Sequence, residues 1–383
     1  MCSRRGDDHG RMRIGVDIYQ TGFPFGGIAR YVRALVSAMA AAAPSDRFVL
    51  VSNHFRRNHA PWRHPGPNVT HVDLQFPRRL MQTCWNRIGW PSMDSFAGPL
   101  DIFHGTHFVL PPVRTAKRVL TVHDLTFLRH PEYFSDGPLN LRGHRMELPA
   151  ALKHADVIIA PSDYTRRALI ELMKVPEDRI RVIPEGVEAH FFVSQDRSKL
   201  QEVKDRLGLS RPYLIFLVGT PEPRKNLLRT VAASRLAAPD LDLVIIGPKD
   251  PIRSLLEGDA RGVHLIGSLS EEDLPYVLHG AVLSLYPSLA EGFGLPALES
   301  LAAGVPLVTS DRTAVPEVVG EAAVRIEPES IEEIAQAIRS LLGDEDRRRR
   351  LVEAGKARAR EFSWERSARE VLSLYGELVP SRN

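Results

Sequence analysis

The stretch YLIFLVGTPEPRKNLLRTVAASRLAAPDLDLVII, residues 213–246, contains the pattern that decides the fold. An apolar run at 213–218 is followed by a helix-length segment at 225–237 and by a second apolar run at 242–246. Apolar runs with little polar alternation are typical of strands that are buried on both faces of a parallel sheet. Strand, helix and strand in this order predict two parallel strands joined by a right-handed crossover.

The same alternation extends along the chain in both directions. The apolar runs predict strands at 13–18, 48–52, 101–104, 118–123, 156–160 and 180–183, then at 213–218, 242–246, 263–266, 281–286, 305–309 and 322–326. The segments between them predict helices at 28–42, 145–154, 164–173, 225–237, 295–303 and 330–342. We therefore expect an α/β protein with Rossmann-like, doubly wound parallel sheets.

The alternation of strands and helices is interrupted at 184–212, a charged segment without a clear strand pattern. We therefore expect a domain boundary near residue 188. This division gives one domain at 12–188, a second at 189–361 and a C-terminal helix within 362–383. Ser363 is a suitable N-cap for that helix. Its expected buried face consists of Trp364, Ala368, Val371, Leu372 and Tyr375.

Length and composition narrow the function classes. A chain of 383 residues suits two domains of ordinary size. Its formal net charge of +3 is far from that of a nucleic-acid-binding domain. The two cysteines, Cys2 and Cys84, have no metal-site spacing and suit a reduced compartment. Residues 1–11 contain no apolar signal region and read as an extension before Met12, and the apolar stretch 34–43 is too short to span a bilayer. We expect a cytoplasmic protein that is soluble or peripheral to the membrane.

Two cations, Arg224 and Lys225, follow the strand at 213–218 and are expected to open a helix. Cations at the start of a helix oppose its macrodipole, which is unfavourable unless an anion lies between them and the helix. The planar fork of arginine and the point charge of lysine suit a diphosphate. The alternative is two solvated surface cations.

Two further candidates also follow strands. Gly26 and Gly27 lie between the first strand and a helix, where backbone N–H groups can approach an anion, although an ordinary turn has the same pattern. His123 ends the strand at 118–123 and could hydrogen-bond a substrate, with Asp124 fixing its orientation. The alternative for this second pair is a purely structural role.

The segment EGFGLPALE, residues 291–299, places two carboxylates around a glycine loop. Pro296 suits the first turn of a helix that starts at Leu295 or Pro296, so we expect Glu291 in the loop and Glu299 in that first turn. Carboxylate oxygens accept hydrogen bonds from neighbouring hydroxyls, which a ribose or a hexose offers. This segment therefore predicts a sugar site.

A rival interpretation is a dinucleotide fingerprint. GFGLPA, residues 292–297, matches G-x-G-x-x-A, and Asp311 follows the next strand. However, Glu291 and Glu299 would put negative charge beside a pyrophosphate, and the segment lies late in its half whereas a fingerprint normally opens one.

No segment predicts a metal site. Asp240 and Asp242 form a D-x-D pattern, but they precede their strand and so lie at the edge of the sheet opposite the ligand site. The charge run at 344–350 is typical of a solvated helix face.

The basic and aromatic segment at 76–90 has two interpretations. It could contact a membrane surface or an acceptor, or it could be a domain helix with Trp85 and Trp90 packed inward.

Taken together, these segments resemble the retaining glycosyltransferases of family 4, from about residue 12 to residue 378. EGFGLPALE resembles the E-x7-E motif of that family and is specific in combination with GTPEPRKN. TVHDLTFLRHPEYF at 121–134, APSDYTRRAL at 160–169 and VIPEGV at 182–187 resemble segments of its bacterial mannosyltransferase-like members. FSWE at 362–365 resembles the start of the terminal helix of the family. The resemblance implies the GT-B architecture, in which two Rossmann-like domains, for acceptor and donor, face a central cleft and a terminal helix crosses back to the first domain.

The resemblance also implies residue roles. The donor diphosphate would be held by Gly26, Gly27, Arg224 and Lys225, the ribose by Glu299, and the donor hexose by Glu291, Phe293 and Gly294. His123 and Glu291 are the implied catalytic residues. Many relatives carry an arginine where this chain has Thr220, so we expect this chain to bind the donor diphosphate more weakly.

The implied activity is transfer of a hexose with retention of anomeric configuration, without metal or cofactor. The expected donor is a nucleoside-diphosphate sugar, with GDP-mannose as the best match. The expected acceptor is a glycan or lipid-linked saccharide of cell-surface polysaccharide synthesis, with peripheral contact at the inner membrane face and no nucleic-acid partner. The alternatives are a nicotinamide-dependent oxidoreductase and a catalytically silent sugar-nucleotide-binding subunit.

Overall fold

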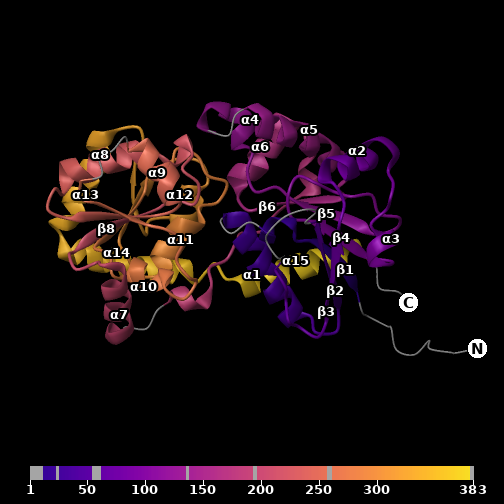
Figure 1. Cartoon of the computed structure of the whole chain (residues 1–383), viewed down its shortest axis with the longest axis horizontal. Coiled ribbons are helices and arrows are strands. Elements are labelled where there is room, and N and C mark those ends of the chain that lie inside the picture. Colours follow the sequence, from indigo (N-terminus) through magenta and orange to yellow (C-terminus); the bar gives the residue numbers. More distant parts are fainter. Residues whose placement is uncertain are drawn as a thin grey trace, which may run out of the picture.

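The computed structural model describes residues 12–22, 26–53, 62–134, 138–192, 196–256 and 261–379. They form two α/β halves that lie side by side, the first indigo to magenta and the second mostly orange (Figure 1). Each half is built on its own parallel sheet. The predicted fold class, two doubly wound parallel-sheet domains, is confirmed.

The first half contains, within the described ranges, a seven-stranded parallel sheet in the order β3-β2-β1-β4-β5-β6-β7. Its strands are β1 (Arg13–Asp17), β2 (Arg47–Asn53), β3 (Val69–Leu74), β4 (Ile102–Gly105), β5 (Lys117–Thr121), β6 (Val157–Ala160) and β7 (Ile180–Val182). The strand order reverses between β1 and β4. In open parallel sheets, ligands bind outside the carboxyl ends of the strands at such a switch point.

The second half repeats this arrangement with six strands among its described residues, in the order β10-β9-β8-β11-β12-β13. They are β8 (Tyr213–Leu217), β9 (Asp242–Ile246), β10 (Val263–Ile266), β11 (Leu283–Tyr286), β12 (Leu307–Ser310) and β13 (Val324–Ile326). Every residue of β8 and β9 is buried, as expected for strands covered on both faces. The switch point lies between β8 and β11.

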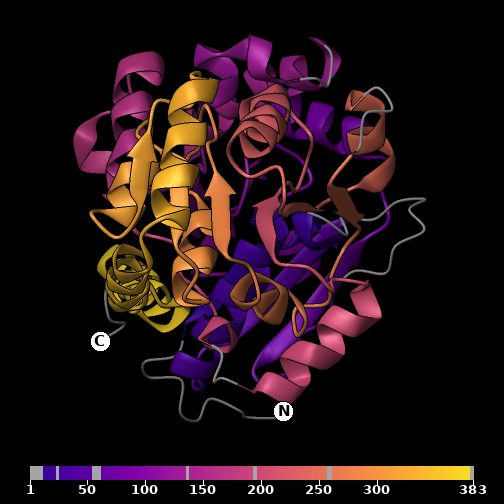
Figure 2. The same cartoon turned by 90° about the vertical axis from the view of Figure 1, so that its left-hand side faces the viewer.

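Helices flank both sheets, as Figure 2 shows for the second half. Those of the first half are α1 (Gly27–Ala42), α2 (Arg78–Ile88), α3 (Asp94–Ala97), α4 (Thr126–Arg129), α5 (Pro138–His154) and α6 (Asp163–Met173). Next come α7 (Arg197–Leu207), α8 (Leu227–Ala237), α9 (Lys249–Leu255), α10 (Leu274–His279), α11 (Leu295–Ala302), α12 (Val315–Val319), α13 (Ile331–Leu342), α14 (Glu345–Ala359) and α15 (Trp364–Leu378).

Strand β3 was not predicted. Its sequence interrupts apolar residues with Thr70, His71 and Asp73, and most of its residues are only partly buried. This composition follows from its place at the edge of the sheet, where it pairs with β2 alone. A search for continuous apolar runs detects strands buried on both faces and misses such an edge strand.

The C-terminal helix α15 packs against α1 of the first half (Figure 1). Ser363 caps it, as predicted, by accepting a hydrogen bond from the backbone N–H of Arg366. The Trp364 ring meets the Tyr31 ring edge-on at 5.8 Å, and the Tyr375 hydroxyl lies 2.6 Å from Nδ1 of His104 in β4. On the expected buried face, Trp364, Ala368, Val371 and Tyr375 are buried and Leu372 is partly buried.

Between the two sheets, the chain runs from the end of β7 at Val182 to the start of β8 at Tyr213 and forms α7 on the way. The predicted boundary at residue 188 falls in this crossing and stays a prediction. The extension at 1–11 lies outside the described residues. Over the described part of the chain, no helix is both long and apolar enough to cross a membrane.

Replacing His104 by Gln should make the stability of the protein less sensitive to acid. Burial, with a smaller contribution from His123, lowers the pKa of His104 from 6.5 to about 3. Between these values the unfolded chain binds a proton at this position and the folded chain does not. His104 therefore lowers the free energy of unfolding by about 1.4 kcal/mol for each pH unit below 6.5.

Urea unfolding of the His104→Gln variant should show a correspondingly shallower loss of stability between pH 6.5 and pH 4.5. The comparison uses slopes with pH, so a constant cost of the substitution does not affect it. His130→Gln, at a half-exposed histidine, is the control. Equal slopes for the original chain and the His104→Gln variant would contradict the prediction.

Candidate functional site

A cleft lies where the carboxyl ends of the second sheet face α1 of the first half. The first half contributes Gly26, Gly27, Arg30 and Arg33. The opposite wall consists of the loops that follow β8, β9 and β10 and of the start of α11 with Glu299. The cleft therefore occupies the position expected for a ligand site in sheets of this kind.

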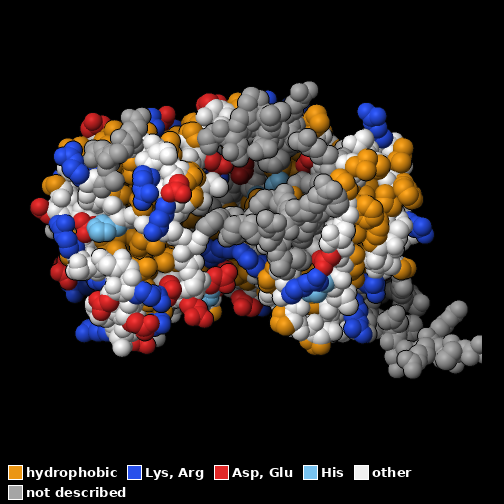
Figure 3. All heavy atoms as spheres, in the orientation of Figure 1, with side chains coloured by type: hydrophobic (Ala, Val, Ile, Leu, Met, Phe, Trp, Pro, Cys, Tyr) orange, Lys and Arg blue, Asp and Glu red, His pale blue; other side chains and the backbone are white. Residues whose placement is uncertain are grey.

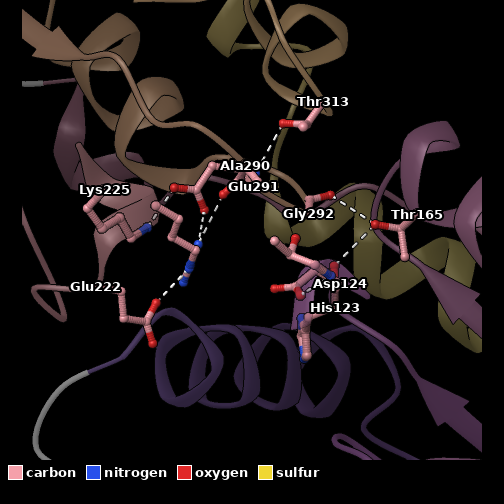
Figure 4. A network of polar contacts seen from close by, with 11 residues as sticks. His123, Asp124, Thr165, Glu222, Lys225, Ala290, Glu291, Gly292 and Thr313 are labelled. Atoms are coloured by element: carbon pink, nitrogen blue, oxygen red, sulfur yellow. Dashed lines mark hydrogen bonds and ion pairs between the residues drawn. The ribbon is translucent and has the colours of Figure 1, made fainter. Parts of the chain in front are cut away.

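Glu291 follows β11 and is almost completely buried. Its Oε1 accepts a hydrogen bond from Lys225 Nζ at 2.7 Å, and its Oε2 accepts one from Arg224 Nη1 at 2.7 Å (Figure 4). Glu222 in turn accepts from Arg224 Nε at 2.6 Å. Burial favours the neutral acid, but the charges of Lys225 and Arg224 outweigh it and hold the pKa of Glu291 at about 2. Glu291 is thus ionised within a charge-balanced cluster.

Arg224 and Lys225 do not open a helix, contrary to the prediction. They belong to a 3-10 turn at Pro223–Lys225, and Asn226, in the left-handed conformation at φ 62°, separates that turn from α8. The side chain of Asn226 fixes the turn by donating to the carbonyl oxygens of Pro287 and Pro328. The compensating charge for the two cations is therefore Glu291. Burial and the neighbouring Arg224 lower the pKa of Lys225.

Glu299 lies in the second turn of α11, because the helix begins at Leu295. The prediction of the helix start is confirmed, and the prediction that Glu299 lies in the first turn is wrong. Its side chain is 2% exposed and lines the cleft. Burial raises the pKa of Glu299, and Arg30 of the first half opposes this effect through a 2.5 Å ion pair between its Nη1 and Glu299 Oε1.

Gly26 and Gly27 lie directly across the cleft from α11. Gly26 precedes α1 and has φ 136°, which favours glycine. A Cβ atom at Gly27 would lie 3.8 Å from the side chain of Leu295, at the start of α11. The glycine turn and the start of α11 are therefore close neighbours where the two halves meet, while the assignment of this turn to a diphosphate stays a prediction.

His123 follows β5, and both of its ring nitrogens already face oxygen atoms. Nδ1 lies 3.1 Å from Glu185 Oε1, and Nε2 lies 3.1 Å from the carbonyl oxygen of Thr106. Asp124 does not orient the ring, contrary to the prediction, because its carboxylate accepts from the backbone N–H of Thr126. Glu185 orients His123 instead. The catalytic role of His123 stays a prediction.

The glycine loop between Glu291 and α11 contacts the first half directly. The carbonyl oxygen of Gly292 accepts a hydrogen bond from Thr165 Oγ1 at 3.3 Å (Figure 4). It also accepts one from Ser162 Oγ at 2.7 Å. A Cβ atom at residue 292 would lie 2.0 Å from the carbonyl oxygen of His123, so only glycine fits. Gly292 therefore serves an inter-half contact, which argues against the dinucleotide interpretation of this loop.

The two other predicted residues of this loop take different positions. Phe293 is buried, and its ring meets the Phe362 ring at 5.9 Å. Gly294 has φ 112° and forms the N-cap of α11. That the backbone of Phe293 and Gly294 contacts a hexose stays a prediction.

The D-x-D pattern has a structural explanation. Asp242 is the first residue of β9 and forms ion pairs with Arg211 at 3.0 Å and His264 at 3.2 Å. Over the described ranges, no group of three or more His, Cys, Asp or Glu side chains is arranged to hold a metal ion.

Sequence reasoning missed Arg30, Glu185 and Glu188. Arg30 lies one helical turn after the glycine turn, which is a signal that it shares the same side of α1. Glu185 and Glu188 lie in the crossing that follows β7, where no periodic pattern distinguishes them from solvated carboxylates. Their partners, His123 and Arg30, are more than 60 residues away in the sequence.

Comparisons with known proteins identify the family of the chain. Residues 201–358 match the family described as Glycosyl transferases group 1, and residues 25–191 match the family described as Glycosyltransferase Family 4. O-antigen chain mannosyltransferase B of Escherichia coli is 32% identical over 284 residues, which cover 72% of this chain and 74% of that protein. MMP alpha-(1->4)-mannosyltransferase of Mycolicibacterium hassiacum is 32% identical over 421 residues, covering 96% and 98%.

The fold is also similar to a solved structure. Sucrose-phosphate synthase from Thermosynechococcus elongatus superposes with a TM-score of 0.76, covering 96% of this chain and 99% of that one. The sequence identity is 22%, so the similarity is one of fold.

Removing the charge of Glu291 should destabilise the protein through the two cations it leaves behind. Because Glu291, Lys225 and Arg224 are buried together, we expect Glu291→Gln to lower the free energy of unfolding by about 3–5 kcal/mol. Adding Lys225→Met should recover part of that loss, since the substitution removes one unpaired cation. Urea unfolding of both single variants and the double variant measures the coupling, and strictly additive effects would contradict the ion-pair assignment.

Proposed function

The chain belongs to glycosyltransferase family 4, with the GT-B architecture, and on that premise we propose that it transfers a hexose from a nucleoside-diphosphate sugar to a saccharide acceptor with retention of configuration. The observation that carries the proposal is the cleft itself. It sets a buried, ionisable carboxylate, Glu299, opposite a glycine turn and two arginines. Glu299 can accept hydrogen bonds from hydroxyls, and the glycine turn and the arginines can bind phosphate, within one site.

In this proposal the ribose hydroxyls donate to Glu299, and the diphosphate lies between the glycine turn and the start of α11. The positive end of the α11 dipole favours an anion there. Arg224 and Lys225 remain proposed phosphate ligands that share their charge with Glu291. The hexose then lies near Glu291 and the Phe293–Gly294 backbone.

The proposed chemistry is a front-face displacement. The bond between the hexose anomeric carbon and the phosphate oxygen breaks, and the acceptor oxygen bonds to that carbon on the same face. The acceptor proton passes to the departing phosphate. The protein supplies positioning and electrostatic stabilisation, with His123 held beside the site by Glu185 and Thr106. We propose that the reaction needs neither a metal ion nor a cofactor.

The proposed donor is GDP-mannose, and the proposed acceptor is a glycan or lipid-linked saccharide in cell-surface polysaccharide synthesis. Support comes from the names of the two relatives that are 32% identical, both mannosyltransferases, one of them of an O-antigen chain. The family membership favours transfer over the nicotinamide-dependent and catalytically silent alternatives.

We further propose a cytoplasmic protein that contacts the inner face of the membrane through the segment 76–90. Figure 3 shows hydrophobic side chains gathered on the face over α2 and α3. Phe76, Leu80, Ile88 and Trp90 are large hydrophobic residues exposed in and beside α2. The segment contains no acidic residue. Trp85 is half-buried and donates to the carbonyl oxygen of Pro91, so the inward packing considered for both tryptophans holds for Trp85 alone.

A donor screen tests the proposed reaction. We expect the chain to hydrolyse GDP-mannose slowly, and to transfer mannose when an acceptor is added, with the same rate in excess chelator. UDP-glucose and ADP-glucose are the competing donors, and NADH fluorescence titration tests the oxidoreductase alternative. Consumption of a UDP-sugar with GDP-mannose untouched would overturn the donor assignment, and activity restored only by added manganese or magnesium would overturn the metal independence.

Replacing Glu299 by Gln should weaken nucleotide binding while keeping the shape of the side chain. A hydrogen bond to a charged group contributes about 1.5–3 kcal/mol, so affinity for the nucleoside diphosphate should fall roughly 10- to 150-fold. Isothermal titration calorimetry measures the change. Glu353→Gln, at an exposed carboxylate of α14, is the matched control. Unchanged affinity in the Glu299→Gln variant would remove this carboxylate from the ribose site.

A further inference from the structure

Arg30 connects the two halves of the molecule across the cleft. It lies one helical turn after the glycine turn at the start of α1. Its Nη1 donates to Glu299 Oε1 of α11 at 2.5 Å, and its Nη2 lies 3.2 and 3.3 Å from the carboxylate oxygens of Glu188. The guanidinium also lies over the Phe191 ring, 5.3 Å from its centre. Arg30 therefore holds a predicted ribose ligand of the second half from the opposite wall.

These contacts leave part of Arg30 unsatisfied. Its Nε is buried and finds no hydrogen-bond acceptor among the residues the structure describes. The Nε of Arg33, one turn further along α1, is likewise buried and lacks an acceptor within the described ranges. A buried donor without a partner carries a desolvation cost that an incoming acceptor removes. Both arginines line the cleft together with Gly26 and Gly27.

The cations of the second half are differently placed. Arg224 and Lys225 are buried against Glu291, and Arg224 also pairs with Glu222. Of the described residues that line the cleft beside Glu299, the lysine or arginine side chains are Arg30 and Arg33 alone. The cationic groups nearest to a diphosphate in this cleft therefore come from the first half.

We propose that Arg30 is a donor-binding residue whose guanidinium exchanges Glu299 for the donor diphosphate when a nucleotide enters the cleft. The inference rests on the proposed function and adds to it a phosphate ligand from the first half, one that lines the cleft itself. Arginine suits the role because its planar fork binds phosphate oxygens in a bidentate manner.

The exchange leaves every buried charge with a partner. Glu299 cannot lose Arg30 without replacement, because a buried unpaired carboxylate is strongly unfavourable. The ribose supplies two hydroxyl donors to Glu299, and the diphosphate supplies oxygen acceptors to Arg30, including for the unsatisfied Nε. A nucleoside without phosphates supplies the hydroxyl donors for Glu299 but no oxygen acceptors for Arg30. Arg30 should therefore matter for the diphosphate and matter little for the nucleoside.

The experiment compares these two ligands directly. Binding of GDP and guanosine, with UDP and uridine in parallel, is measured by calorimetry and ligand-observed NMR for the original chain and for Arg30→Gln. We expect Arg30→Gln to weaken GDP binding roughly 10- to 150-fold and to change guanosine binding by less than about threefold. Arg30→Lys should lie between, because lysine retains the charge and loses the fork.

The matched control is Arg349→Gln, at an exposed arginine of α14 that pairs with Asp346 on its own helix. It should leave both affinities unchanged. Thermal unfolding of each variant establishes that it is folded. If Arg30→Gln fails to fold, Arg30→Lys alone carries the comparison, with a larger loss for GDP than for guanosine as the expected result.

Two outcomes would overturn the inference. Equal losses for GDP and guanosine would mean that Arg30 acts only by orienting Glu299. Unchanged affinity for both would mean that Arg30 only joins the two halves. The proposed function fails separately, because it requires the original chain to bind a nucleoside diphosphate before any substitution is made.

Discussion

The geometry of the site depends on one close backbone contact, between Gly292 of the second half and His123 of the first. The hydrogen at the α-carbon of Gly292 is all that fits against the carbonyl oxygen of His123. Ser162 and Thr165 donate hydrogen bonds to the Gly292 carbonyl oxygen. Residues of the first half therefore contact both the α-carbon and the carbonyl group of Gly292. The carboxyl end of β5 is thereby fixed next to the loop that follows β11. The Glu291 cluster and the His123 pair are neighbours for this reason.

Charge is distributed differently on the two walls of the cleft. In the second half, Glu291 and Glu222 balance Arg224 and Lys225 at short range. A buried cluster of this kind is tolerated because each charge has a partner, and its summed field at a distance is small. In the proposed function, the attraction of the cleft for an anion then depends on the glycine turn, on Arg33 and on the release of Arg30 from Glu299. The donor diphosphate, on this account, is recognised by both halves and not by the donor-binding half alone.

Sequence reasoning recovered what depends on local pattern. Apolar runs located the strands that are buried on both faces, and the proline of EGFGLPALE located the start of α11. The failures arose where a residue's partner is distant in the sequence. His123 is oriented by Glu185 and not by its neighbour Asp124, and Arg30 binds a carboxylate 269 positions away. The single-turn helix at Pro223–Lys225 was read as part of α8, because the left-handed Asn226 that separates them has no signature in a pattern of apolar and polar residues.

The two chain crossings between the halves lie side by side, and this arrangement links them to the cleft. The backbone N–H of Val187 in the first crossing donates to the carbonyl oxygen of Phe362 in the second, at 3.1 Å. Gly186 packs so closely on this second crossing that a Cβ atom would lie 2.3 Å from the backbone nitrogen of Trp364. The two crossings are therefore packed against each other at this point. Glu188, which immediately follows Val187, is the second ion-pair partner of Arg30.

Arg30 connects the wall of the cleft to this crossing. Glu188 belongs to the crossing, whereas Glu299 belongs to the wall of the cleft, and Arg30 binds both carboxylates at once. In the exchange proposed above, Glu188 would remain as the carboxylate partner of Arg30, two residues from Gly186, where the crossings touch. In this structure a single guanidinium, that of Arg30, therefore joins the wall of the cleft to the crossing between the halves.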